Sequence, residues 1–444
     1  MAKLRKSRFC FLIDQADDHL VYCASTNSFY KINEAVSTFI ANCDCQEEQA
    51  NDESLQQLRR LRLITTEQED DAMVDVLKMS FLAKSFSKDT IGITFAPTLQ
   101  CNLCCPYCFE KTKASKMMDL KTCDRVVEFI KGHKYAKYFQ LTWYGGEPLV
   151  GSKVIRHFLS KINELENVKL VSHGMVTNAT LLNGNNLELF REHPLTHIQV
   201  TLDGMERTHD QRRIRHDKSG TFSTIIANLK TFVEAYPQTS VAIRVNVDKN
   251  NYKEFMPIWR MIREMFPEKN NIFTYPGILH KCGKQDNNSP FLENDEIAAI
   301  KELFVKDGYP LEYPNIVDSG CYATSLQGYI IGPQGEIYKC WEDVGCANRV
   351  VGNVVDRKYT NMPLLADYML HGSHILEEQC NKCPLLPVCN NDCAKHRLEN
   401  SEDNAGYNLC SLYKNNQFSS LKHVLYNFYK TYVEKKQVPA GSLH

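Results

Sequence analysis

The middle of the chain, residues 89 to about 280, switches repeatedly between two patterns of hydrophobic and polar positions. Short apolar stretches predict six strands: IGITFAP, YFQLTWYG, KLVSHGMVTN, HIQVTLDG, SVAIRVNVD and NIFTYPGIL. Between them, apolar residues at three- and four-residue steps predict helices, among them DRVVEFIKGH, KVIRHFLSKINEL, TFSTIIANLKTFVEAY and EFMPIWRMIREMF. This alternation predicts a parallel βα architecture, either an open doubly wound sheet or a partial barrel. In both, functional sites lie at the C-terminal ends of the strands.

The two flanks carry different patterns. Residues 1 to about 88 predict a small α+β unit, with strands in RFCFLID, LVYCAST and SFYKIN and helices in EAVSTFIAN and SLQQLRRLRLI, before an acidic, polar stretch, TTEQEDDA. Residues 321 to 410 are turn-rich with little periodicity, so we expect this segment to need cross-links, such as metal sites, to stay folded. The final FSSLKHVLYNFYKTYVEKK predicts an amphipathic helix that packs onto the body of the protein.

Length, charge and hydropathy limit the class of protein that this chain can be. A chain of 444 residues with 43% hydrophobic residues predicts two or three domains with buried cores. The formal net charge of -1 gives no electrostatic case for a nucleic-acid or membrane partner. No run of 18 or more apolar residues is present, and Asp14 interrupts the short apolar run near the start. We therefore expect a cytoplasmic protein.

Cysteines are abundant and unevenly distributed. In a reducing compartment, 18 cysteines indicate metal or cluster sites rather than disulfides. One group lies just after the first central strand, in CNLCCPYC, and another lies near the C-terminus: Cys321, Cys340, Cys346, Cys380, Cys383, Cys389, Cys393 and Cys410. The others are scattered and are expected to be small buried hydrophobes: Cys10, Cys23, Cys43, Cys45, Cys123 and Cys282.

The first group has the spacing C-x3-C-x2-C through Cys101, Cys105 and Cys108. A loop of this kind can point three thiolates at one face of a cubane iron–sulfur cluster and leave one iron open. A structural zinc site would require four ligands in paired spacing. Adjacent residues rarely both reach one metal, so we interpret Cys104 as a packed thiol.

With an aromatic residue, Tyr107, before its last cysteine, this loop resembles that of the radical S-adenosylmethionine (SAM) superfamily. The resemblance implies that SAM chelates the open iron and is cleaved to a 5′-deoxyadenosyl radical. It also implies a partial (β/α)6 TIM-type barrel. By the same resemblance, the ring of Tyr107 packs near the adenine of SAM.

Other stretches at the predicted strand ends resemble further motifs of that superfamily: WYGGEP, VTNATLL, TLDG with the basic stretch after it, and RVNVD. Ala179 stands where the third-strand motif has glycine. The resemblance implies that the following residues line the SAM site: Gly145, Gly146, Glu147, Asn178, Thr201, Arg213 and Asn246. Arg213 and Thr201 would face the SAM carboxylate, for which a planar guanidinium offers two charge-assisted bonds.

The C-terminal cysteines resemble the SPASM pattern, C-x(9–15)-G-x4-C followed by C-x2-C-x5-C-x3-C and a final C. The resemblance implies two auxiliary [4Fe–4S] clusters, and therefore three clusters in all. The outer cluster would be held by Cys380, Cys383, Cys389 and Cys410, and the inner one by Cys321, Cys340 and Cys393. The fourth inner ligand is Cys346, or that iron is open to a substrate thiolate. The rival hypothesis is a pair of zinc ribbons, which predicts closed four-cysteine units.

These patterns predict four segments: a leader-recognition-like α+β domain at 1–88, a radical SAM core at 89–318, a cysteine-rich SPASM domain at 319–415 and a C-terminal helix and tail at 416–444. The first segment resembles the winged-helix-like domain that precedes many peptide maturases. Such a domain captures a leader peptide as an added strand. The alternative is an inert structural cap.

Three functional hypotheses follow. The first is a radical SAM/SPASM maturase of a ribosomally synthesised precursor peptide, forming a thioether or carbon–carbon cross-link and served by a flavodoxin- or ferredoxin-type electron donor. The second is an anaerobic sulfatase maturase that makes formylglycine. Those enzymes carry an Asp directly after the cysteine at 340, where this chain has Trp341, followed by Glu342 and Asp343. The third is a cysteine-rich scaffold without catalysis.

Overall fold

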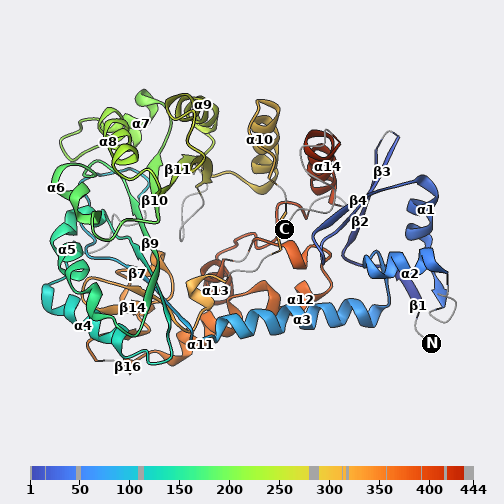
Figure 1. The fold of residues 1–444 in the computed structure, drawn as a ribbon, viewed down its shortest axis with the longest axis horizontal. Coiled ribbons are helices and arrows are strands. Elements are labelled where there is room, and N and C mark those ends of the chain that lie inside the picture. The colour runs from blue at the N-terminus through green and yellow to red at the C-terminus, as the bar shows by residue number, and fades with distance from the viewer. Residues whose placement is uncertain are drawn as a thin grey trace. The chain divides into compact units, whose positions relative to one another are not determined.

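The computed structural model describes residues 3–15, 17–46, 52–108, 115–279, 290–312, 314–316, 320–356, 358–391, 393–414 and 418–434. The chain divides into two compact units, each described here by itself (Figure 1). The central unit comprises Phe86–Ile300 and Tyr322–Met369, and the terminal unit comprises Met1–Ser85, Lys301–Cys321 and Leu370–His444. Among the described residues, no helix is both long enough and apolar enough to cross a membrane.

The central unit is built on six parallel strands that are neighbours in chain order: β7 (Thr90–Phe95), β8 (Tyr138–Trp143), β9 (Lys169–Thr177), β10 (His197–Leu202), β11 (Ser240–Val247) and β12 (Ile272–Ile278). All six predicted strands are confirmed, and so is the α/β class. The order contains no reversal, whereas a doubly wound sheet reverses its order at a switch point. The strand order therefore favours the barrel-type alternative.

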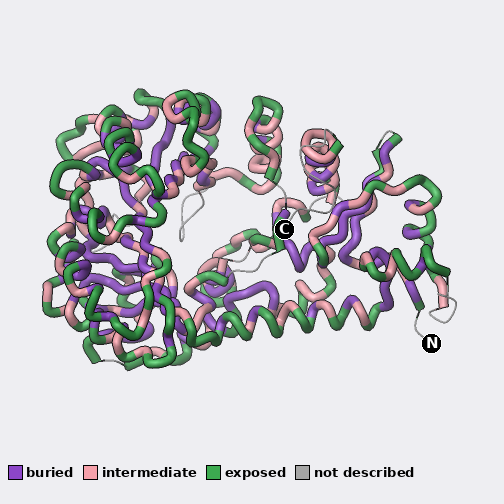
Figure 2. Tube along the Cα trace, in the orientation of Figure 1, coloured by how far each residue is buried: buried purple, intermediate pink, exposed green. Residues whose placement is uncertain are grey.

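The helices that alternate with these strands are α4 (Leu120–Lys131), α5 (Ser152–Ser160), α6 (Gly184–Leu187), α7 (Glu206–Arg212), α8 (Phe222–Ala235), α9 (Phe255–Met265) and α10 (Asn294–Lys306). Helix α4 illustrates why they form. Asp119 caps its first turn by accepting the N–H of Thr122, and Cys123, Val126 and Ile130 repeat along its buried face. Figure 2 shows the strands as the most continuously buried segments of this unit, with exposed positions on the helices.

Four further strands extend this sheet beyond β7: β13 (Gly328–Ile331), β14 (Glu336–Tyr338), β15 (Gly352–Asn353) and β16 (Lys358–Tyr359). Strand β13 pairs parallel with β7, and the next three are antiparallel. The sequence predicted no strands between residues 321 and 410. Strands of two to four residues are too short to display an alternating pattern.

The terminal unit contains two small antiparallel sheets. One joins β1 (Lys3–Lys6) to β5 (Cys45–Gln46) and β6 (Ile64–Thr65), and the other has the order β2 (Cys10–Gln15), β3 (Asp18–Cys23), β4 (Ser28–Ile32). These sheets and the helices α1 (Glu34–Asn42) and α2 (Glu53–Arg60) contain every element predicted for this segment.

Helix α3 (Glu67–Ser85) was not predicted, because its acidic start was interpreted only as a polar stretch. Its first turn is fixed by a tertiary contact. The buried Asp70 carboxylate accepts hydrogen bonds from the Ser7 hydroxyl at 2.8 Å, the Arg8 N–H at 2.8 Å and the Thr65 hydroxyl at 2.9 Å. Sequence periodicity cannot reveal a contact of this range.

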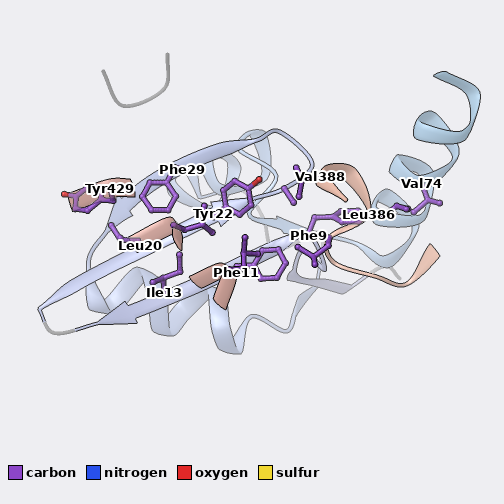
Figure 3. Packing of buried hydrophobic residues seen from close by; sticks show 14 of the residues in the cluster. Phe9, Phe11, Ile13, Leu20, Tyr22, Phe29, Val74, Leu386, Val388 and Tyr429 are labelled. Carbon is purple, nitrogen blue, oxygen red and sulfur yellow. The ribbon is translucent and has the colours of Figure 1, made fainter. Parts of the chain in front are cut away.

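The N-terminal sheet β2–β3–β4 shares one hydrophobic core with C-terminal segments (Figure 3). These segments contain α12 (Glu378–Asn381) and α14 (Ser419–Phe428). Two further helices of the C-terminal region, α11 (Met362–His371) and α13 (Ala394–Asp403), contribute no described residue to this core. Phe11 and Phe29 of the sheet belong to the same buried cluster as Leu386 and Leu425, and the ring of Tyr429 lies 5.8 Å from that of Phe29. The expected packing of the C-terminal helix onto the body of the protein is confirmed.

Candidate active site

The cysteine loop begins directly after β7 and is tied to residues 116–118 on its far side. Leu99 N–H donates to the carbonyl of Lys116 at 2.8 Å, and Met118 N–H donates to that of Pro97 at 2.9 Å. Within the loop, the N–H of Cys108 donates to the carbonyl of Cys105 at 3.2 Å, which closes a tight turn between two predicted ligands. The loop therefore lies at the carboxyl end of β7, the first of the six parallel strands, as its sequence position predicted.

The three predicted ligands in this loop, Cys101, Cys105 and Cys108, are buried or partly buried thiols. Burial raises the pKa of Cys101 to about 12 and also raises the pKa of Cys105, and the Cys105 thiol feels the charges of Cys108 and Arg213. Among the described residues, no three His, Cys, Asp or Glu side chains already form a group able to hold a metal ion. The donor set fits an iron–sulfur cluster, because soft thiols ionise when they bind one.

Cys104 is engaged on a different segment. Its thiol donates to the carbonyl of Arg215 at 3.3 Å, and its N–H donates to the carbonyl of Ile214 at 2.8 Å. These contacts tie the cysteine loop to the segment that follows α7. They agree with the interpretation of Cys104 as a packed thiol.

The glycine pair after β8 lies against the backbone of the cysteine loop. A Cβ on Gly145, whose φ is +127°, would lie 2.3 Å from the carbonyl oxygen of Thr98. A Cβ on Gly146 would lie 2.4 Å from that of Gln100 and 2.6 Å from that of Leu99. Both positions therefore require glycine for the approach of the loop itself, a contact that the sequence motif did not predict.

Glu147 follows this pair and is fully buried. Oε1 accepts hydrogen bonds from the N–H of Leu149 at 3.0 Å and the hydroxyl of Thr177 at 2.8 Å, and Oε2 accepts the N–H of Asn178 at 2.8 Å. Burial raises the pKa of Glu147, although these three donors oppose the shift. The carboxylate thus joins the carboxyl ends of β8 and β9.

Two predicted SAM-site residues, Arg213 and Asn246, converge on the hydroxyl of a third, Tyr107. It accepts hydrogen bonds from Arg213 Nη1 at 3.0 Å and Asn246 Nδ2 at 3.3 Å, and it donates to Asp203 Oδ1 at 2.8 Å. Burial raises the pKa of Tyr107. The remaining predicted SAM-site residue, Thr201, is buried in β10.

Sequence reasoning missed three charged residues of this cluster: Asp203, Arg212 and Asp248. Arg212 Nε donates to Asp203 Oδ2 at 2.9 Å, and its Nη2 lies 2.9 Å from Asp248 Oδ2. A signal was present, because TLDG and VNVD each place an Asp directly after a strand. Carboxyl ends of parallel strands meet at one edge of a sheet, where such side chains gather.

The C-terminal cysteines are divided between the two units. Cys380, Cys383 and Cys389 all pack against the core shared by β2–β3–β4 and α14. Burial raises the pKa of Cys380 to about 11, and the Cys383 and Cys389 thiols contribute to the same shift. These three predicted ligands of the outer cluster therefore lie near one another.

The fourth predicted outer ligand, Cys410, and two predicted inner ligands, Cys321 and Cys393, belong to the same terminal unit. Lys414 Nζ lies 3.7 Å from the Cys410 sulfur. Cys340 and Cys346 belong to the central unit, on a turn in which Cys346 N–H donates to the carbonyl of Asp343 at 2.8 Å.

The scattered cysteines are buried as expected at four positions: Cys10, Cys23, Cys43 and Cys123. The first three gather in one hydrophobic cluster of the terminal unit, against which Cys45 also packs. Cys282 lies outside the described residues.

The strand order, the cysteine loop and the buried charged cluster at the strand ends together define an α/β protein with a candidate site at one edge of its sheet. Residues 95–278 match the family model described as the Radical SAM superfamily, so the chain carries a radical SAM domain. A domain of this superfamily implies an enzyme that uses SAM and a [4Fe–4S] cluster.

A cysteine-type anaerobic sulfatase-maturating enzyme of Clostridium novyi is 20% identical over 348 residues, which are 71% of this chain and 90% of that protein. The structure of anSMEcpe with bound AdoMet and Cp18Cys peptide superposes with a TM-score of 0.57 at 16% identity, covering 79% of this chain and 99% of that one. Streptococcus suis SuiB bound to its precursor peptide SuiA gives a TM-score of 0.51 at 14% identity, covering 92% of this chain and 99% of that one. This chain thus shares the fold of both structures.

Proposed function

We propose that this protein is a radical SAM/SPASM maturase that cross-links residues of a ribosomally synthesised precursor peptide. One observation carries the choice of substrate. The sulfatase-maturase-type structure covers 79% of this chain, whereas SuiB in complex with its precursor peptide covers 92%. The additional share supports a fold that extends beyond the sulfatase-maturase body, as a leader-recognition domain would require.

In this proposal, Cys101, Cys105 and Cys108 hold the SAM-binding cluster. The SAM contacts come from the strand-end residues Tyr107, Gly145, Gly146, Glu147, Asn178, Thr201, Arg213 and Asn246. Arg213 binds the SAM carboxylate. Among the described residues, the buried Nε of its guanidinium has no hydrogen-bond partner, which supports this role because a buried cation with an open donor favours an anionic ligand. When bound, the reduced cluster and SAM supply a 5′-deoxyadenosyl radical for hydrogen abstraction from the peptide.

The auxiliary clusters are proposed for the same ligands as in the sequence analysis. The outer cluster takes Cys380, Cys383, Cys389 and Cys410, and their common position in the terminal unit supports this set. The inner cluster takes Cys321, Cys340 and Cys393, with Cys346 or an open iron in fourth place. Closing a thioether or carbon–carbon bond removes two hydrogens from the peptide. One leaves as a hydrogen atom that converts the 5′-deoxyadenosyl radical to 5′-deoxyadenosine. The other leaves as a proton, and an auxiliary cluster, when bound, would accept its electron.

The sheet β2–β3–β4 is the proposed leader site. In the described chain, β2 and β4 each pair only with β3, so each has an outer edge with unpaired backbone groups. An extended leader peptide can add to such an edge as a further strand. The core shared with α14 and the cysteine-rich segment would hold this sheet rigid during binding.

Formylglycine chemistry is the second candidate, supported by the relative from Clostridium novyi. The residues after Cys340 argue against it. Trp341 stacks on Tyr144, with ring centroids 5.5 Å apart, and leaves no carboxylate at the position where sulfatase maturases carry their base. Asp343, two residues after Trp341, is fully buried, and its carboxylate accepts a hydrogen bond from the Tyr368 hydroxyl at 2.5 Å.

The test uses the anaerobically reconstituted enzyme with SAM and dithionite. It is incubated in parallel with the short peptide encoded beside its own gene and with a sulfatase peptide that carries the target Cys or Ser. We expect about twelve iron atoms per chain, as three [4Fe–4S] clusters require, and a loss of two hydrogens from the first peptide. Formylglycine in the second peptide alone would support the other candidate. Intact clusters without 5′-deoxyadenosine would contradict both candidates and leave the scaffold hypothesis.

A further inference from the structure

The carboxylate of Asp203 is the centre of the buried cluster at the ends of β10 and β11. The residue is fully buried. Oδ1 accepts the Tyr107 hydroxyl at 2.8 Å, and Oδ2 accepts Arg212 Nε at 2.9 Å. Asn246 Nδ2 also lies 3.4 Å from Oδ1. Both oxygens of Asp203 are therefore occupied by groups of the chain.

Arg212 is fixed on two sides. Its guanidinium pairs with Asp203 and, through Nη2 at 2.9 Å, with Asp248. The same guanidinium covers the ring of Tyr107, with its central carbon 5.1 Å from the ring centroid. Burial alone would lower the pKa of Arg212, but the two carboxylates raise it overall. Arg212 thus clamps Tyr107 against the strand ends.

Arg213, the next residue, lies farther from Asp203 than Arg212 does, although among the described residues each of the two arginines has one buried nitrogen without a hydrogen-bond partner, Arg212 Nη2 and Arg213 Nε. Arg213 Nη1 contacts the Tyr107 hydroxyl at 3.0 Å but lies 3.7 Å from Asp203, beyond a direct hydrogen bond. The side chain of Arg213 is only 11% exposed, and its buried Nε has no hydrogen-bond partner among the described residues. Asp203 therefore forms a long ion pair with Arg213, and its direct hydrogen bonds go to Tyr107 and Arg212.

We propose that Asp203 and Arg212 are positioning residues for SAM binding. They fix Tyr107, and with it the turn from Cys105 to Cys108, and they keep the Arg213 guanidinium available to the carboxylate of SAM. This inference rests on the SAM site proposed above. In this inference, Asp203 and Arg212 act on SAM binding through Tyr107 and Arg213, without contacting SAM themselves.

The first test compares wild type with Asp203→Asn in the iron-loaded enzyme. The affinity for SAM is measured by titrating the electron paramagnetic resonance spectrum of the reduced cluster, and the KM and kcat for 5′-deoxyadenosine formation are measured alongside. We expect unchanged iron content, SAM affinity weaker by about tenfold or more, and a larger effect on KM than on kcat. Loss of a charge-assisted hydrogen bond has this size.

Tyr107→Phe is the second variant, because Asp203→Asn removes a buried negative charge and endangers folding. It keeps the aromatic ring and removes only the hydroxyl that links Asp203 to Arg213. We expect the same direction of change. The double variant should bind SAM with the same affinity as the more affected single variant, because both substitutions disrupt one hydrogen-bond network. A purely structural role would instead lower iron content or stability, without the selective change in KM.

Asp124→Asn is the matched control. Asp124 pairs with His157 on the surface of the same unit, so its SAM affinity should equal that of wild type. Unchanged SAM affinity in iron-loaded Asp203→Asn and Tyr107→Phe would overturn the proposal. Failure of the proposed function looks different. Wild type would then not remove two hydrogens from the precursor peptide, whatever the SAM affinity of the variants, and would form no 5′-deoxyadenosine if SAM chemistry failed altogether.

Discussion

The backbone N–H of Asn178 donates a hydrogen bond to the buried carboxylate of Glu147 at 2.8 Å. This bond joins the glycine-rich turn after β8 to the turn after β9. The Asn178 side chain continues the series, since its Nδ2 donates to Asn102 Oδ1 at 2.9 Å and lies 3.8 Å from the Cys101 sulfur. Three strand ends are thus coupled through polar contacts to the first predicted ligand of the cysteine loop.

Gly146→Ala tests how far the cysteine loop depends on the turn after β8. The added Cβ would meet the carbonyl oxygens of Gln100 and Leu99 at 2.4 and 2.6 Å, which forces the loop away. We expect the variant to lose most of the iron of the SAM-binding cluster and to cleave little SAM. Iron content and 5′-deoxyadenosine formation are the measurements.

Gly132→Ala is its control, because Gly132 has no positive φ and its Cβ would come no closer than 3.2 Å to a neighbouring carbonyl. It should keep wild-type iron content and SAM cleavage. Full iron content and activity in Gly146→Ala would show that the loop is not held by this contact.

Much of the central unit could be predicted because its strands are long enough to carry a pattern. The six strands from β7 to β12 have six to nine residues each, and their order places the motif residues at one sheet edge. Strands β13 to β16 are too short for this, and α3 depends on the contacts of Asp70.

The site divides in the same way. The motif residues Tyr107, Arg213 and Asn246 were predicted and meet at one hydroxyl. Asp203 and Arg212 were not, because their partners lie up to 96 positions away and no motif links them. A sequence shows that charges follow several strands, but only the fold shows which charges pair.

Leu425→Ala tests the core shared by the two ends of the chain. Leu425 of α14 is fully buried in the cluster that contains Phe11 and Phe29 of the N-terminal sheet. Its truncation should destabilise this core by about 2 kcal/mol or more. Amide hydrogen exchange in β2 and β3 should then be about thirtyfold faster if it proceeds through opening of this core.

The neighbouring Val424→Ala is the control, since Val424 is only half-buried on the same helix. It should accelerate exchange in β2 and β3 far less. Equal exchange in wild type and Leu425→Ala would mean that the N-terminal sheet is stable without α14.

His173 gives the central unit a pH dependence. It is buried, accepts a hydrogen bond from Trp143 Nε1 at 2.8 Å, and burial lowers its pKa to about 4. The unfolded chain therefore binds a proton near pH 6.5 that the folded chain rejects until about pH 4. The contribution of His173 to stability is fully present above pH 6.5 and is lost as the pH falls toward 4.

His173→Gln should therefore differ from wild type less at pH 5.5 than at pH 7.5, by about 1 kcal/mol in the free energy of unfolding. Urea unfolding followed by tryptophan fluorescence measures this, because Trp143, Trp259 and Trp341 all belong to the central unit. His157→Gln, at a surface pair with Asp124, is the control. A pH-independent difference between wild type and His173→Gln would contradict the assignment.

The central claim is that three cysteines of CNLCCPYC bind a cluster whose remaining iron takes SAM, while Cys104 only packs. It is tested most directly by measuring 5′-deoxyadenosine from SAM and dithionite in reconstituted Cys104→Ala and Cys105→Ala. Cys104 donates to the carbonyl of Arg215 instead of facing the cluster, so its variant should cleave SAM largely as wild type does. Cys105→Ala should form no 5′-deoxyadenosine above background. Inactivity of an iron-loaded Cys104→Ala, or SAM cleavage by Cys105→Ala, would contradict the claim.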